Sequence, residues 1–191
     1  NRTRLFFAPT ARTLPATSGY FSISQIFFPM LAVGVTDWLT FSGGMSLLPG
    51  ASNQLFYAAP KIRAVHTETF DLSGGVLYMG IPGTSDPFGI IYGVGSAGSS
   101  TAALTMGLGW GFYGDKTAES PTLVVGGELQ VSESTKFLTE NWFPTGADIG
   151  IISIGIRFFG EHLAGDFGLM TTTESSRGFP FLPWVGFVYN F

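Results

Sequence analysis

The chain has 191 residues, a formal net charge of −4 and only 12% charged residues, whereas a typical soluble domain has about 25%. It contains no cysteine, which excludes a disulfide framework and thiolate chemistry, and its charge gives no reason to expect nucleic-acid binding. Apolar residues make up 45% of the chain, yet no apolar run reaches the roughly 18 residues of a membrane-spanning helix. Two classes remain: a soluble β protein with a large core, or a β-barrel in lipid, because only helices and closed barrels satisfy the backbone inside a membrane.

Strand-like segments alternate with clusters of turn residues along the whole chain. In chain order the predicted strands are residues 3–13, 19–36, 38–48, 54–66, 69–82, 88–97, 100–113, 121–132, 136–143, 148–159, 163–173 and 180–191. Pro9 interrupts the first segment, and the ninth leaves both Glu140 and Asn141 as candidates for its inner face. We predict a single all-β domain over residues 1–191, an antiparallel transmembrane barrel of twelve strands, with ten or fourteen as alternatives. Bacterial single-chain barrels have even strand numbers.

Two sets of turns separate these strands. One set recurs at regular intervals, at residues 36–37, 66–68, 97–99, 132–134 and 160–162. The other set is richer in proline and glycine and lies between them, at residues 15–19, 49–53, 82–87, 114–120, 144–148 and 173–180. Successive turns of an antiparallel meander lie at opposite ends of the sheet. The pattern therefore predicts hairpin units with short turns at both ends of the barrel.

Alternation within the strands indicates which face meets lipid. In residues 100–113 the large side chains share one face and small or polar residues occupy the other; the large ones are Leu104, Met106, Leu108, Trp110 and Phe112. A soluble sandwich also buries its large residues, so alternation alone does not decide. Aromatic residues near strand ends and scarce charge are typical of a transmembrane barrel, whose apolar outer band is flanked by aromatic girdles. We therefore predict that the large residues face lipid.

The C-terminus carries the most specific motif. Val185, Phe187, Tyr189 and Phe191 share one face of the last strand, and the final residue is aromatic. This strand resembles the terminal strand of bacterial outer-membrane β-barrel proteins, which the barrel-assembly machinery recognises. The resemblance implies a place in the outer membrane, contact with its lipid, and an assembly signal at Phe187, Tyr189 and Phe191. It also implies that the C-terminus, Asn1 and the regularly spaced turns face the periplasm.

Continuing the alternation places a set of charged residues on the inner face. A charge facing lipid costs about 2–4 kcal/mol for Arg or Lys at the membrane midplane. We therefore expect the following side chains to line the lumen: Arg4, Arg12, Lys61, Arg63, Asp71, Glu128, Glu140, Arg157 and Asp166. Hairpin geometry pairs Arg157 with Asp166 and Arg63 with Asp71. Two interpretations stay open, a polar pathway with a charge filter or ion pairs that fill a narrow barrel, because twelve strands lie between filled and open barrels.

The sequence shows no catalytic constellation. His66 and His162 are the only histidines, and both fall in predicted periplasmic turns. Outer-membrane phospholipases and omptin proteases, which the chain resembles in architecture, use histidine near the extracellular side. The two histidines belong to non-adjacent hairpins and have no evident third ligand, so we predict no enzyme, no metal site and no cofactor.

Two functions are consistent with this architecture. The first hypothesis is a narrow passive pore for small solutes, because the strand count, the glycine-rich inner face and the short loops favour an open lumen. Arg12 and Trp184 are expected to form a constriction near its extracellular end. The alternative is a structural barrel that anchors or binds a partner subunit of unknown identity, motivated by the paired inward charges.

Overall fold

The computed structural model is all β and describes residues 2–83, 86–174 and 181–191. No helix in these ranges is long and apolar enough to cross a membrane. The strands are β1 (Gly19–Ser24), β2 (Phe28–Thr36), β3 (Leu39–Met45), β4 (Phe56–His66), β5 (Phe70–Gly80), β6 (Phe88–Gly98), β7 (Ala102–Tyr113), β8 (Lys116–Thr117), β9 (Thr122–Ser132), β10 (Thr135–Pro144), β11 (Ile151–Phe159), β12 (Leu163–Thr172) and β13 (Leu182–Asn190).

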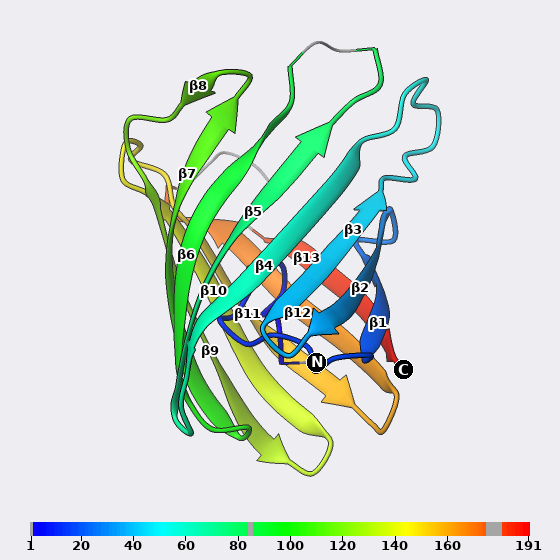
Figure 1. Cartoon of the computed structure of the whole chain (residues 1–191), viewed down its shortest axis with the longest axis vertical. Helices are drawn as coiled ribbons and strands as arrows, with labels where there is room; N and C mark the ends of the chain where they lie inside the picture. Colours follow the sequence, from blue (N-terminus) through cyan, green and yellow to red (C-terminus); the bar gives the residue numbers. More distant parts are fainter. Residues whose placement is uncertain (1, 84–85, 175–180) are drawn as a thin grey trace.

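All strands except the two-residue β8 belong to one closed antiparallel barrel (Figure 1). Each of these strands pairs with two others, and β1 pairs with β13 to close the sheet. β7 pairs with both β6 and β9, so β8 adds only a short hairpin to the end of β7. Closure leaves no sheet edge on which another chain could add a strand. The predicted antiparallel barrel of twelve strands is confirmed.

The two ends of the barrel differ in their connections. Gly19 and Phe191 exchange two backbone hydrogen bonds, of 2.9 and 3.0 Å, where β1 begins and β13 ends. We call this the C-terminal end, and it also holds the connections that follow β2, β4, β6, β9 and β11. The far end holds the β1–β2 turn and the connections that follow β3, β5, β7, β10 and β12.

The barrel wall exposes large apolar side chains outside and encloses small or polar ones. In β11, Ile152 and Ile154 are 43% and 64% exposed, whereas Ser153 and Arg157 are 2% and 1% exposed. Successive side chains of a strand point to opposite faces of the sheet. The alternation read from the sequence therefore places the apolar face outward in this strand.

Residues 3–13 do not form the predicted first strand. The N-terminal segment, residues 2–18, runs inside the barrel as an irregular coil (Figure 1). Leu5 and Phe6 are 1% and 0% exposed, so consecutive residues are buried, which a two-faced strand does not allow. Pro9 lacks the N–H that a sheet ladder requires. The prediction was wrong because an apolar run without two-residue alternation was read as a strand.

The predicted strand 19–36 is divided into β1 and β2 by a tight turn at residues 25–27. Gln25 and Ile26 adopt positive φ angles of 50° and 67°, a region that a β-branched residue rarely occupies. No glycine, proline or asparagine marks this turn, which is why the sequence did not reveal it. The strand number is preserved because one predicted strand lies in the lumen and another is divided in two.

The position of residues 15–19 changes as a consequence. They were predicted as a turn at the end opposite the C-terminus, yet Gly19 is hydrogen-bonded to Phe191. The N-terminal segment therefore leaves the lumen at the C-terminal end, where it continues into β1. Asn1, predicted to be periplasmic, lies outside the described residues.

Candidate functional site: the barrel lumen

The first group of charges lies where the N-terminal segment contacts β11 and β12. Arg157 and Asp166 are partners in the register of these strands. The guanidinium donates to both carboxylate oxygens, at 2.6 Å from Nε and 2.9 Å from Nη2. Arg4 adds a second cation, with its Nη2 3.6 Å from Asp166 Oδ2, and its side chain is 5% exposed. Because both side chains are buried, the loss of Asp166 would leave two cations without a counter-charge.

Side chains from the barrel wall also bind the backbone of the N-terminal segment. Arg157 Nη2 donates to the carbonyl of Leu5 at 2.7 Å. From β10, the Glu140 carboxylate accepts hydrogen bonds from the backbone amides of Phe7 and Ala8, both at 2.9 Å. A buried backbone group that has no ladder partner needs one of another kind. The inward charges therefore serve as partners for a segment that forms no sheet.

Lys61 has a similar role on the opposite wall, in β4. Its Nζ donates to three carbonyl oxygens of the N-terminal segment, those of Thr3 at 3.1 Å, Thr10 at 2.8 Å and Arg12 at 2.6 Å. The three donors of an ammonium group are thereby all used. Lys61 is 4% exposed, so its charge is stabilised by these carbonyl dipoles.

A second ionic group lies in the lumen near the C-terminal end. The Glu128 carboxylate binds Arg12 Nη1 at 2.6 Å and Lys136 Nζ at 3.0 Å. The same two cations donate to carbonyls of the β6–β7 connection, Arg12 to Ser99 and Lys136 to Ser100. Lys136 was missed by the sequence reasoning. It lies on the same face of β10 as Glu140, so extending the alternation from that residue would have found it.

The remaining predicted charges form a small group at the ends of β4 and β5. Asp71 Oδ1 lies 3.8 Å from Arg63 Nη1 and 2.6 Å from His66 Nδ1. The His66 side chain is 61% exposed. His162 belongs to another hairpin, beside Tyr189. Among the described residues, no group of three histidine, cysteine or acidic side chains is placed to hold a metal ion.

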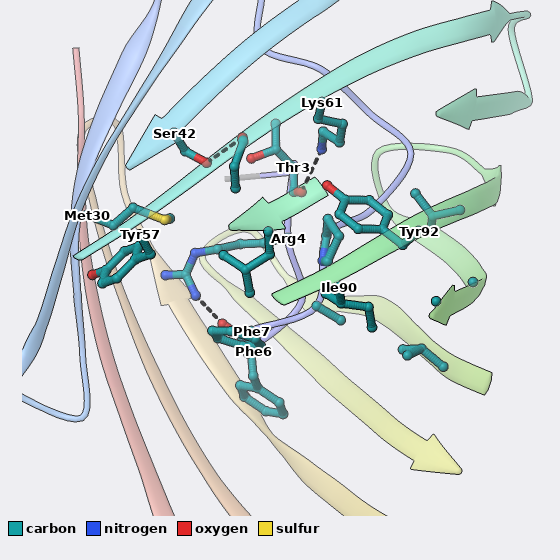
Figure 2. A pocket seen from close by; sticks show the side chains of 18 of the residues that line it. Thr3, Arg4, Phe6, Phe7, Met30, Ser42, Tyr57, Lys61, Ile90 and Tyr92 are labelled. Atoms are coloured by element: carbon teal, nitrogen blue, oxygen red, sulfur yellow. Dashed lines mark hydrogen bonds between the residues drawn. The ribbon is translucent and has the colours of Figure 1, made fainter. Parts of the chain in front are cut away.

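A chamber of about 400 Å³ occupies the part of the lumen that the N-terminal segment leaves free (Figure 2). Arg4, Phe6 and Lys61 border it on the side of the segment. Gln25 and Leu55 border it at the far end. The chamber thus reaches from the ionic groups to the far rim of the barrel.

The predicted constriction between Arg12 and Trp184 is wrong. Arg12 is bound at the C-terminal end to Glu128 and to the β6–β7 connection. Trp184 instead packs against Phe6, with ring centroids 6.0 Å apart, in a cluster that includes Leu138. The lumen is narrowed by the N-terminal segment, which the sequence reasoning had placed in the wall.

No protein-family model matches this sequence, and no curated protein matches it. Among solved structures, the chain is similar to the KdgM porin in complex with disordered oligogalacturonate, with a TM-score of 0.69 and 9% sequence identity. The alignment covers 91% of this chain and 98% of that one. A second structure of the KdgM porin gives a TM-score of 0.67, with the same identity and coverage. At this level of identity the comparison concerns the fold: the chain shares the twelve-strand barrel architecture of a bacterial porin.

Proposed function

We propose that this chain is an outer-membrane channel for small solutes, in which the N-terminal segment restricts the path. The observation that carries the proposal is a closed barrel that encloses a chamber of about 400 Å³. A barrel that served only to anchor a partner subunit would not require an interior chamber that extends to the far end of the barrel. The similarity to the KdgM porin supports a channel over the alternative of a structural barrel that binds a partner.

The outer surface supports a place in lipid. Large side chains such as Ile154, Leu104 and Phe167 are more than half exposed on it, and such a surface is stable only against an apolar solvent. An apolar band with aromatic residues toward its edges is typical of outer-membrane barrels. We propose that the C-terminal end faces the periplasm, and that Phe187, Tyr189 and Phe191 contact the assembly machinery.

The N-terminal segment determines how wide the path is. It contacts β4, β10 and β11 through Lys61, Glu140 and Arg157, so it spans the lumen from one wall to the other. The chamber lies on its far-end side. A solute entering from the far rim would reach the segment before it reached the C-terminal end.

Single-channel recording in planar bilayers tests this function. The full chain is expected to give small, stable conductance steps. A variant in which residues 3–12 are replaced by a glycine–serine sequence of equal length is expected to give larger steps, because the contacts with the wall are lost. If neither protein conducts while both migrate as folded barrels, the chain is not a channel.

A further inference from the structure

We propose that the chamber binds a small amphipathic carboxylate, whose head group is held at Arg4 and whose apolar chain extends toward the far rim. This inference rests on the proposed function, because it names the class of solute that would occupy the channel. It is drawn from the lining of the chamber, from buried donors that have no acceptor, and from the charges at its inner end.

The wall of the chamber is largely apolar. Phe28, Met30, Leu77, Met79, Ile90 and Val124 contribute to its lining. Such a surface favours a solute with an apolar part over an inorganic ion, because apolar area is stabilised by contact with an apolar partner rather than with water. A volume of about 400 Å³ lies within the range of small-molecule pockets.

Two buried side chains at the inner end carry donors with no hydrogen-bond partner among the described residues. They are Nε and Nη2 of Arg4 and Nε1 of Trp184, and both residues line the chamber. Figure 2 shows Arg4 beside Phe6 and Tyr57 at the chamber, with its one drawn hydrogen bond directed back to the N-terminal segment. Buried donors without acceptors are costly and uncommon. A ligand with an acceptor group at the inner end of the chamber would supply such a partner.

Both donor groups lie near the Asp166 carboxylate. A Cβ added to Gly186 would be 3.4 Å from Trp184 Nε1 and also 3.4 Å from Asp166 Oδ2. That same carboxylate oxygen is 3.6 Å from Arg4 Nη2. The donors of Arg4 and Trp184 thus belong to the same inner part of the lumen, and Arg4 can bind a ligand carboxylate through the paired donors of its guanidinium.

The charges at the inner end favour an anionic head group. Arg4 and Lys61 line the chamber, and no acidic side chain of the described residues does. Asp166 is hydrogen-bonded to Arg157 and lies 3.6 Å from Arg4 Nη2, and Glu140 binds the N-terminal segment, so neither carboxylate needs a ligand cation. The three donors of Lys61 all bind carbonyl oxygens, so Lys61 offers an anionic ligand its positive charge but no free donor. Arg4 is the lining cation whose Nε and Nη2 donors have no hydrogen-bond partner among the described residues.

The depth of the chamber sets the length of the apolar chain. Tyr57, Ala59 and Lys61 of β4 all line it. At about 3.3 Å per residue, the stretch from Tyr57 to Lys61 spans about 13 Å along the strand. An extended decanoate is of comparable length, which makes it a suitable probe.

Equilibrium dialysis of radiolabelled decanoate against the full chain in lipid nanodiscs tests the proposal. Empty nanodiscs measure the partition of decanoate into lipid, and decanol tests the role of the carboxylate. We expect saturable binding of one decanoate per chain and weaker binding of decanol. The variant Arg4→Gln should bind decanoate at least about tenfold more weakly, the effect of losing a hydrogen bond to a charged group. The matched control Arg63→Gln, in a lumen arginine that does not line the chamber, should bind normally.

A second pair of variants leaves the N-terminal segment untouched. Ala59→Leu narrows the chamber and should weaken saturable binding, whereas its neighbour Ala58→Leu, on the outer face of the same strand, should not. Absence of saturable binding, or binding that Ala59→Leu does not reduce, would overturn the proposal. Equal affinity for decanol, or normal affinity in Arg4→Gln, would overturn the assignment of a carboxylate. Conductance without decanoate binding would reject this inference alone, and binding without conductance would reject the channel alone.

Discussion

Replacing Asp166 by alanine tests whether the inner lumen is dry. Asp166 is 0% exposed and is the shared counter-charge of Arg157 and Arg4. The substitution leaves both cations close together with no anion between them. Breaking a buried pair in this way costs on the order of 3–5 kcal/mol. Arg157 keeps its hydrogen bonds to the carbonyls of Leu5 and Arg4, which places the expected loss at the lower part of that range.

For a protein of this size, such a loss lowers the midpoint of thermal unfolding by roughly 10 °C. The assay is the heat-dependent mobility of the folded barrel on a gel, measured across a temperature series in one detergent. The matched control is Asp115→Ala, because Asp115 is exposed in a connection at the far end. The double variant Arg157→Met/Asp166→Ala should recover part of the loss, since one of the two stranded charges is removed.

A midpoint for Asp166→Ala that equals that of Asp115→Ala would refute this reasoning. It would mean that water reaches Arg157 and screens its charge, and hence that the N-terminal segment does not cover this pair. A double variant less stable than Asp166→Ala would show that the carbonyl bonds of Arg157, rather than its charge, dominate its contribution.

Three further perturbations address the segment and the closure of the barrel. Lys61→Met removes three hydrogen bonds to the N-terminal segment and should raise single-channel conductance, whereas the exposed Lys116→Met should leave it unchanged. Gly34→Ala would place a Cβ 2.0 Å from a backbone oxygen of the segment and should lower the unfolding temperature, while Gly160→Ala, with nothing within 4 Å, should not. Deletion of Phe191 removes both backbone bonds to the start of β1 and should reduce the amount of barrel in the membrane. Phe191→Ala keeps those bonds, so normal levels of this variant would show that the aromatic ring is not the assembly signal.

Much of the wall could be predicted because a transmembrane strand has two faces with opposite requirements. The alternation of Ile152, Ser153 and Ile154 reflects lipid on one side and a packed interior on the other. It also fixes the register, which is why Arg157 faces Asp166 as the hairpin geometry predicts. In such strands the apolar residues of the sequence mark the outer face and the small or polar residues mark the inner face, so the sequence predicts which side chains are buried.

The N-terminal segment inside the lumen does not show this two-residue alternation. The N-terminal segment is surrounded by barrel wall on all sides, so Leu5 and Phe6 are both buried and the pattern resembles a fully buried strand. The length of the predicted strand 19–36 was the available clue, because a transmembrane strand needs only about 9–11 residues. The turn at Ile26 carries no residue that usually marks a turn, and only its tertiary setting holds it.

The N-terminal segment has a consequence for the order in which this protein folds. It precedes all the described strands in the chain, yet the amides of Phe7 and Ala8 bind Glu140, which lies 133 and 132 positions later. The carbonyl of Leu5 is bound by Arg157, 152 positions away. These contacts cannot form until β10 and β11 exist, and contacts between such distant positions form slowly. The N-terminal segment is therefore fixed in place only after these strands have formed, and it must lie within the curving sheet before β1 meets β13.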